Sequence, residues 1–338
     1  MPREPLLDVQ DLKVEFWTSR GNIYAVNGIS FDIAPGETLG IVGESGCGKS
    51  VTSLAILGIL ARAGRVTSGT AMFEGRDLIK LSDEELRGVR GREIAMIFQD
   101  PMTSLNPVLT IGYQIQEVLR THFGLDKRDS ADRAAELLDR VGIPNAPARL
   151  RDYPHQFSGG MRQRAMIAMA LACQPKLLIA DEPTTALDVT IQAQILDLLR
   201  ELVSEQDTAL ILITHDLGVV AGMCERVNVM YAGMFMETGT ATQVFARPRH
   251  PYTLGLLQSV PRLDAARKTM LHPIEGNPRD MLSPPQACPF APRCRYEVEE
   301  STRSVPLLEQ VEPGHKVACF NPVPEDEWQK MREAALSA

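Results

Sequence analysis

Short apolar runs along the chain predict buried strands. Residues 39–42 (LGIV), 176–180 (KLLIA) and 209–214 (ALILIT) are rich in apolar side chains and too short for typical helices. Residues 25–33 alternate between apolar and polar side chains, and residues 6–16 mix the two. Both of these segments predict strands and turns in the N-terminal part of the chain.

Apolar residues at helical spacing separate these runs. The spacing predicts helices over about residues 49–60, over Ala131–Val141 and over about residues 191–205. The stretch from about 101 to 171 is mostly helical in pattern. Strands that alternate with helices predict a parallel sheet covered on both faces, which is an α/β fold.

The composition of the chain changes after about Arg247. Residues 273–292 hold six prolines, which prevent long regular elements. We therefore expect a domain of residues 1–250 and a small irregular C-terminal extension of residues 251–338. A polar, helix-like stretch at residues 325–336 would end that extension.

Composition and charge exclude several classes of protein. The 338 residues are 44% hydrophobic and 23% charged, which is ordinary for a globular chain. The longest uncharged apolar run, Ala165–Cys173, has nine residues, whereas a membrane helix needs about 20. The first residues lack the apolar core of a signal peptide, so secretion is not expected. The net charge of −8 argues against a broad basic surface for nucleic acid.

A glycine-rich stretch between a predicted strand and a predicted helix points to nucleotide binding. Residues 43–50 (GESGCGKS) match the phosphate-loop pattern G-x-x-x-x-G-K-[ST]. In such loops backbone N–H groups surround the phosphates, the lysine reaches the β- and γ-phosphates, and the final hydroxyl holds Mg²⁺. The expected nucleotide contacts here are Gly43, Ser45, Gly46, Cys47, Gly48, Lys49, Ser50 and Val51.

Two carboxylates at the end of a predicted buried strand supply the second half of such a site. Asp181 and Glu182 follow the apolar residues 177–180. Asp181 is expected to hold Mg²⁺, directly or through water, together with Ser50. Glu182 is expected to act as the general base that polarises the attacking water.

The stretch Phe157-Ser158-Gly159-Gly160-Met161 narrows the class of enzyme. It resembles the L-S-G-G-Q signature of ATP-binding cassette (ABC) ATPases, from which Phe157 and Met161 depart. The resemblance implies a P-loop, ABC-type nucleotide-binding domain with a helical subdomain at about 101–171. It also implies that ATP is sandwiched between two ATPase subunits, with Ser158, Gly159 and Gly160 of one subunit facing the phosphate loop of the other.

Other elements of the cassette follow in the family's order. By resemblance, Gln99 is the Q-loop residue that senses Mg²⁺ and the γ-phosphate, residues 186–188 form the D-loop, and His215 is the switch histidine. An aromatic residue should stack on adenine. The family pattern favours Phe16 for this role, with Tyr24 as the alternative.

Two further stretches resemble the ATPase subunits of oligopeptide and dipeptide (peptide/nickel) importers. They are residues 100–107 (DPMTSLNP) and residues 249–253 (RHPYT). The resemblance implies a peripheral subunit at the cytoplasmic face of the inner membrane, which binds ATP and Mg²⁺. Its expected partners are a second ATPase subunit (identical or related), two permeases and an extracytoplasmic substrate-binding protein. Residues 101–117 would line the permease groove, with Leu105, Asn106 and Leu109 as contact candidates.

The sequence leaves the solute and one alternative function open. Dipeptides, longer peptides, nickel complexes and modified peptides all remain candidate solutes. The alternative function is an ABC ATPase of a non-transport complex. The interval between Gly43 and Ser158 is too short for the coiled coil of repair-type relatives, and the chain holds one cassette where translation-type relatives hold two. A P-loop kinase or GTPase does not fit the signature and His215.

Three of the six cysteines cluster in the C-terminal extension, at Cys288, Cys294 and Cys319. In the peptide-importer extension, the resemblance implies four cysteines in the pattern of an iron–sulfur ligand set. Ser301 occupies the expected position of the fourth. A [4Fe–4S] cluster usually takes four cysteine ligands. Either a metal site completed by an oxygen or His315, or free thiols without a stable metal, is compatible with this sequence.

Overall fold

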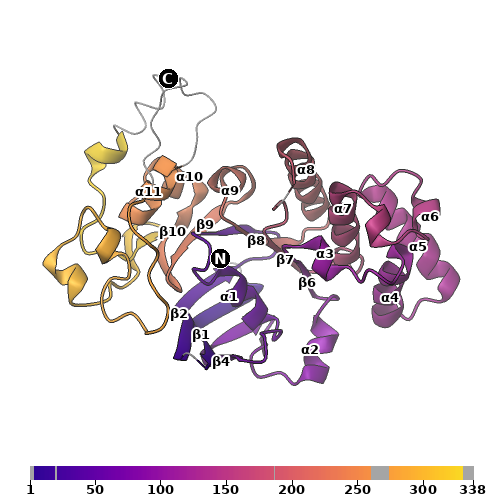
Figure 1. Cartoon of the computed structure of the whole chain (residues 1–338), viewed down its shortest axis with the longest axis horizontal. Helices are drawn as coiled ribbons and strands as arrows, with labels where there is room; N and C mark the ends of the chain where they lie inside the picture. The colour runs from indigo at the N-terminus through magenta and orange to yellow at the C-terminus, as the bar shows by residue number, and fades with distance from the viewer. Residues whose placement is uncertain (1–3, 20, 186, 260–273, 330–338) are drawn as a thin grey trace. The chain divides into compact units, whose positions relative to one another are not determined.

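The computed structural model describes residues 4–19, 21–185, 187–259 and 274–329 (Figure 1). The chain folds into two compact units. The first unit is formed mainly by Lys80–Ile213, together with Ile33–Thr38. The second unit is formed by Leu7–Asp32, Leu39–Ile79 and the described residues after Ile213.

A parallel sheet forms the centre of the first unit. Strands β6 (Ile94–Ile97), β7 (Leu177–Asp181) and β8 (Ala209–Thr214) pair in that order, with Ile94 opposite Leu177 and Leu177 opposite Ala209. Every residue of β7 is buried, as expected for a central parallel strand. Helix α8 (Val189–Glu205) connects β7 to β8.

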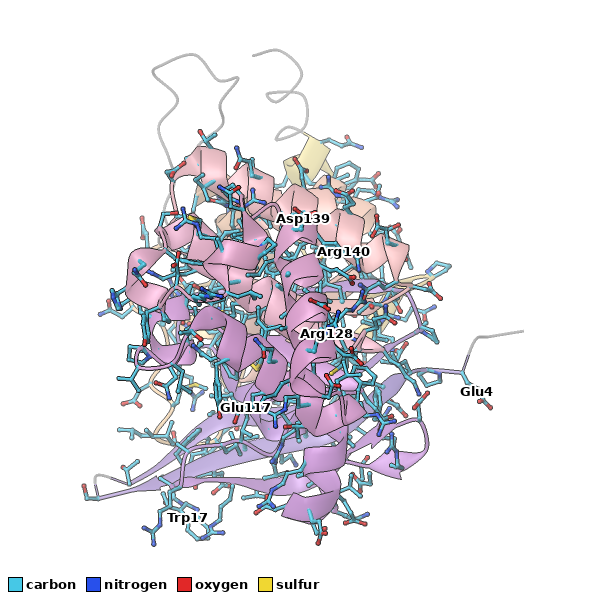
Figure 2. The ribbon with its side chains drawn as sticks, turned by 90° about the vertical axis from the view of Figure 1, so that its right-hand side faces the viewer. Glu4, Trp17, Glu117, Arg128, Asp139 and Arg140 are labelled. Carbon is cyan, nitrogen blue, oxygen red and sulfur yellow. The ribbon has the colours of Figure 1, made fainter. Side chains whose placement is uncertain are left out.

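Several short helices make up the rest of the first unit. They are α2 (Asp83–Val89), α3 (Pro101–Ser104), α4 (Ile111–Phe123), α5 (Lys127–Arg140), α6 (Ala146–Arg149), η1 (Pro154–Gln156) and α7 (Gly159–Ala170). Thr110 and Asp126 cap the N-termini of α4 and α5, and Gly124 ends α4 in a left-handed conformation. Charged residues such as Glu117, Arg128 and Asp139 cover the outer face of α4 and α5 (Figure 2).

The second unit contains an antiparallel sheet and a second group of strands, one of which leads into the phosphate loop. Strands β1 (Leu7–Thr18), β2 (Gly21–Ile33), β4 (Gly64–Phe73) and β5 (Arg76–Asp77) form the antiparallel sheet, in the order β2-β1-β4-β5. Strand β3 (Thr38–Val42) runs parallel to β9 (Arg226–Tyr231), with Leu39 opposite Arg226. Helix α1 (Lys49–Ile56) follows β3 across the glycine-rich loop.

The C-terminal extension is built onto these strands. Strand β10 (Met234–Thr240) pairs with β9, β12 (His315–Val317) pairs with β10, and β11 (Glu309–Glu312) pairs with β12, all antiparallel. The remaining elements of the second unit are α9 (Leu217–Met223), α10 (Ala241–Ala246), α11 (Pro251–Ser259), η2 (Ala291–Arg293) and η3 (Glu299–Thr302). The described residues 274–290, before η2, form no helix or strand, in line with their four prolines, at positions 278, 284, 285 and 289.

The predicted α/β fold is confirmed, with adjustments at element ends. The helix expected over about 49–60 ends at Ile56, and the helix expected from about 191 starts at Val189. Residues 325–329 are helical, and the rest of the stretch expected to 336 lies outside the described residues. In the part of the chain that the structure describes, no helix is both long and apolar enough to cross a membrane.

Candidate functional site

The phosphate loop lies in the second unit and depends on two glycines. Gly43 (φ 156°) leaves β3, and Gly48 (φ 108°) is the N-cap of α1. A Cβ atom at Gly43 would lie 2.1 Å from the carbonyl oxygen of Met230, and one at Gly48 would lie 2.3 Å from that of Ala25. Only glycine fits either position, because the neighbouring backbone approaches so closely.

Lys49 points into the loop that it follows. Its side chain is 5% exposed, and its Nζ donates hydrogen bonds to the carbonyl oxygens of Gly43 (2.8 Å) and Glu44 (3.0 Å). Cys47 Sγ lies 3.8 Å from the same Nζ. Burial raises the pKa of the Cys47 thiol, although Lys49 opposes this shift. A cation inside a glycine loop at the start of a helix suits the phosphates of a nucleotide.

The two acidic residues lie at the end of β7 in the first unit. Asp181 is the last residue of the buried strand and is 5% exposed. Glu182 has a left-handed backbone (φ 46°), and its N–H donates to the carbonyl oxygen of Ile213 (2.8 Å). This conformation takes the chain out of the sheet directly after Asp181. The Glu182 side chain therefore lies at the carboxyl end of the sheet.

Two donors hold the carboxylate of Glu182. Gln99 Nε2 donates to Glu182 Oε2 at 3.0 Å, and Thr185 Oγ1 donates to the same oxygen at 2.8 Å. The structure thus brings together Gln99 and Glu182, two of the predicted site residues. Sequence reasoning missed Thr185, although a hydroxyl three residues after the expected base was a usable signal.

The signature residues begin a helix on the surface of the first unit. Ser158 is the N-cap of α7, and its Oγ accepts the backbone N–H of Met161 at 3.3 Å. Phe157, which departs from the family's leucine, is 2% exposed and anchors this helix start. Ser158 and Gly159 are exposed, so the positive end of α7 is presented to the outside of the unit.

The remaining nucleotide-site candidates occupy distinct positions. His215 is exposed between β8 and α9. Phe16 on β1 and Tyr24 on β2 are both half-buried in the second unit, so both remain candidates for stacking on adenine. Asp188 of the D-loop caps α8, whereas Ala186 lies outside the described residues.

The three C-terminal cysteines gather in the second unit as free thiols, of which Cys288 is buried and Cys294 and Cys319 are partly buried. Burial raises the pKa of Cys288 and Cys294, and raises that of Cys319 to about 12. The charges of Cys288 and Cys294 also raise the pKa of Cys319, which indicates that the three lie close together. Ser301 is their neighbour, since its carbonyl oxygen accepts the N–H of Cys288 at 2.9 Å.

Of the two alternatives left open by the sequence, the iron–sulfur or other metal site at Cys288, Cys294 and Cys319 is not supported. Among the described residues, no group of three or more His, Cys, Asp or Glu side chains could hold a metal ion. His315, considered as a fourth ligand, is fully buried and places its Nε2 2.7 Å from Glu237 Oε1. Ser301 at the fourth position accounts for the difference, because a [4Fe–4S] cluster usually takes four cysteine ligands.

Comparison with known proteins identifies relatives of both parts of the chain. Residues 26–185 match the ABC transporter family, and residues 236–300 match the oligopeptide/dipeptide transporter C-terminal region. The oligopeptide transport ATP-binding protein OppD of Salmonella typhimurium is 55% identical over 324 residues, which is 96% of either chain. The dipeptide transport ATP-binding protein DppD of Bacillus subtilis is 54% identical over 318 residues, 94% of this chain and 95% of that protein.

Solved structures of cassettes are similar in fold. A dimeric ATP-binding cassette in a post-hydrolysis state, bound to ADP and Pi, has a TM-score of 0.63 and 27% identity, and covers 70% of this chain and 98% of its own. A Clostridium perfringens subunit that is part of an ABC transporter complex has a TM-score of 0.60 and 30% identity, and covers 72% of this chain and 91% of its own.

Proposed function

The chain belongs to the ABC transporter family, among the ATP-binding subunits of oligopeptide and dipeptide transporters, and we propose that it hydrolyses ATP to energise peptide import. Two observations carry this proposal, one in each unit. In the second unit a glycine loop encloses Lys49. In the first unit the buried strand β7 ends at Asp181, predicted to hold Mg²⁺, and Glu182, predicted to activate water, follows it directly. We also propose that residues 1–250 form the ATPase domain and that residues 251–338 form the C-terminal extension.

The phosphate loop supplies binding. The backbone of Met230 and Ala25 packs closely against Gly43 and Gly48 and fixes the path of the loop, and the N–H groups of Gly46, Gly48 and Lys49 would bind the phosphates. The Lys49 ammonium exchanges its carbonyl partners for the β- and γ-phosphate oxygens, which are stronger acceptors because they are charged. Phe16 or Tyr24 stacks on adenine, and Ser45, Cys47 and Val51 complete the contact.

The end of β7 supplies the chemistry. Ser50, Gln99 and Asp181 offer the oxygen ligands that Mg²⁺ prefers, and the bound ion would neutralise charge on the phosphates. Glu182 accepts the proton of the attacking water as general base. Gln99 and Thr185 orient the Glu182 carboxylate through the two hydrogen bonds to Oε2. His215 contacts the γ-phosphate, and Ser158, Gly159 and Gly160 complete the site of a second ATPase subunit.

The surface around α3 and α4 offers a contact for the permeases. Leu105, one of the candidates from the sequence, is 3% exposed and packs inside the first unit. Asn106 is exposed, and three apolar side chains near it are exposed by about half or more: Met102 (54%), Val108 (76%) and Tyr113 (48%). We define these four residues as the coupling patch. Exposed apolar groups of this kind are typical of interaction surfaces.

These features favour a peripheral subunit at the cytoplasmic face of the inner membrane. The coupling patch would receive one cytoplasmic segment of a permease, so that closing of the ATPase pair on ATP is passed to the membrane. The proposed assembly contains two permeases, a second ATPase subunit of the same or a related kind, and an extracytoplasmic protein that delivers the peptide.

The test is purification of the tagged chain from native membranes in mild detergent, with partners identified by mass spectrometry. We expect two permeases and a second cassette subunit to copurify, and Val108→Asp to lose them. Leu307→Asp is the matched control, since Leu307 is 75% exposed but lies in the extension. Recovery with ribosomal or DNA-repair proteins instead would refute the transport function and leave the ATPase site standing.

A further inference from the structure

Among the described residues, the hydrogen bonds from the C-terminal extension to the phosphate loop converge on Glu44. The Arg293 guanidinium binds the Glu44 carboxylate with two hydrogen bonds, from Nη1 to Oε2 at 2.7 Å and from Nη2 to Oε1 at 3.0 Å. The Arg293 side chain is 4% exposed and that of Glu44 is 25% exposed. This paired geometry fixes both the position and the orientation of the carboxylate.

A second side chain after residue 250 holds the backbone of the same residue. The N–H of Glu44 donates a hydrogen bond of 2.8 Å to the hydroxyl oxygen of Tyr252. Tyr252 is completely buried at the start of α11. Its ring packs against those of Tyr231 and Phe290, with centroids 4.7 Å and 5.3 Å away. The hydroxyl is therefore held at a fixed point beside the loop.

Arg293 is also held in place by neighbouring groups. Its Nε donates to the carbonyl oxygen of Glu275 at 3.0 Å, and the guanidinium carbon lies 5.8 Å from the centre of the Tyr231 ring and 5.9 Å from that of Phe290. Hydrogen bonding to the Glu44 carboxylate raises the pKa of Arg293, so its charge is permanent. The cation thus occupies a rigid aromatic pocket next to the loop.

The remaining polar group of Glu44 is in contact with the phosphate-binding lysine. The Glu44 carbonyl oxygen accepts Lys49 Nζ at 3.0 Å and the N–H of Cys47 at 3.3 Å. The N–H, the carboxylate and the carbonyl of Glu44 thus each have a partner, in Tyr252, Arg293 and Lys49 respectively. A displacement of Glu44 would move the acceptor that sets the position of the ammonium.

We propose that Arg293 and Tyr252 are positioning residues of the nucleotide site, which hold the phosphate loop in its binding conformation through Glu44. The extension is then a working part of the ATPase rather than an appendage. The proposal rests on the proposed function of the loop. In the contacts described, the hydrogen bonds of both residues to the loop end at Glu44, so we expect their effect on nucleotide binding to pass through that residue.

The test compares equilibrium binding of Mg-ATP and steady-state turnover for the full chain, four single variants and the double variant that combines Glu44→Gln with Arg293→Lys. Arg293→Lys keeps the charge but loses the paired geometry, Tyr252→Phe removes only the hydroxyl, and Glu44→Gln removes the charge that Arg293 binds. The control is Arg247→Ala. Arg247 also ties the extension to the rest of its unit, by an ion pair of 3.1 Å with Glu312, but does not touch the loop.

We expect Arg293→Lys and Tyr252→Phe each to weaken ATP binding by about tenfold, which corresponds to one lost hydrogen bond of about 1.4 kcal/mol. KM for ATP should rise with them, with a smaller fall in kcat. Arg247→Ala should bind ATP as the unmodified chain does. In the Glu44→Gln background, Arg293→Lys should add little further loss, because the two residues act as one unit.

The proposal is overturned if Arg293→Lys and Tyr252→Phe bind ATP as tightly as Arg247→Ala does. It is also overturned if Arg293→Lys, Tyr252→Phe and Arg247→Ala all lose ATP affinity only in proportion to a lowered thermal midpoint. That result would show that the contacts of Arg293 and Tyr252 are purely structural. Failure of the unmodified chain to bind ATP would be a different result. It would refute the nucleotide-site assignment itself.

Discussion

The phosphate loop and the cysteine cluster of the extension are both motifs with fixed spacing. The loop has the geometry that its motif predicts, whereas the cysteines do not form the metal site that their spacing suggests. In the loop, residues 43–50, backbone contacts exclude any side chain at Gly43 and Gly48 and place Lys49 inside. In the cluster, Cys288, Cys294 and Cys319 lie near one another as buried or partly buried free thiols, and Ser301 stands where a fourth ligand was expected.

The difference lies in what each motif needs. A phosphate loop depends on backbone conformation, which each glycine determines locally. A metal site depends on several side chains that must meet with correct geometry and ionisation, and the loss of one ligand removes the site. A partial match to the first kind of motif therefore predicts more than a partial match to the second.

The largest effect should come from Glu182→Gln. Loss of the general base is expected to lower ATP turnover by about 10²- to 10⁴-fold while ATP still binds, which would trap the closed pair of subunits. The control is Glu205→Gln, which removes only an exposed ion pair with Arg140. Steady-state phosphate release measures both. Undiminished turnover in Glu182→Gln would refute the base assignment.

Lys49→Ala should have the next largest effect and tests the loop directly. Removal of two charge-assisted contacts to phosphate is expected to weaken ATP binding by roughly 100-fold. Titration calorimetry with Mg-ATP measures the change, with Lys13→Ala on β1 as the control, because Lys13 is exposed and pairs only with Asp11 among the contacts described. Equal affinity for the two variants would contradict the assignment of the loop.

At the boundary with the extension, His250 predicts that the stability of the fold falls in acid. Burial lowers the pKa of His250 to about 3, and its Nδ1 accepts the N–H of Tyr252 at 3.0 Å. The unfolded chain binds this proton near pH 6.5, so stability from the neutral form is present above that pH and is lost as the pH falls toward about 3. The expected slope from this group is about 1.4 kcal/mol per pH unit.

The slope is measured by urea unfolding between those pH values. His250→Asn should flatten it, although the variant is less stable at neutral pH. The exposed His155 supplies the control, since His155→Asn should leave the slope unchanged. Parallel slopes for His250→Asn and the unmodified chain would show that His250 does not carry the effect.

Cys319→Ala should have the smallest effect of these variants, and it tests whether the cysteine cluster lacks a metal, as the comparison with the phosphate loop assumes. We expect a loss of about 1 kcal/mol in the free energy of unfolding, because a small buried group is removed, and unchanged ATP affinity. Cys224→Ala is the matched control, because Cys224 is a buried thiol between α9 and β9, outside the cluster. Stoichiometric iron in the purified chain, lost in Cys319→Ala but not in Cys224→Ala, would show that the cluster is a metal site after all.

The elements of the fold were predictable where the sequence carries a local signal. The buried run 209–214 became β8 without change, and the run 176–180 became β7 shifted by one residue. The division of the stretch 101–171 into α3 to α7 was not predicted. It depends on caps such as Thr110 and on Gly124, which local periodicity does not register.

The candidate site shows the same limit. Residues in one motif, such as Lys49 and Ser50, could be named from the sequence. The hydrogen bond between Gln99 and Glu182 joins residues 83 positions apart, and it was not predicted, because the family resemblance placed both residues in the site without indicating a contact between them. Arg293 lies 249 positions from Glu44, and neither periodicity nor spacing could connect them, because their meeting depends on how the extension packs.

The central claim is that this chain couples ATP hydrolysis to peptide import. The most direct measurement is ATP turnover of the copurified complex in lipid vesicles, with its substrate-binding protein, in the presence and absence of a mixture of short peptides. The account predicts that peptides stimulate turnover and that Glu182→Gln abolishes the stimulated rate. Turnover that is insensitive to peptides in the complete complex would contradict it.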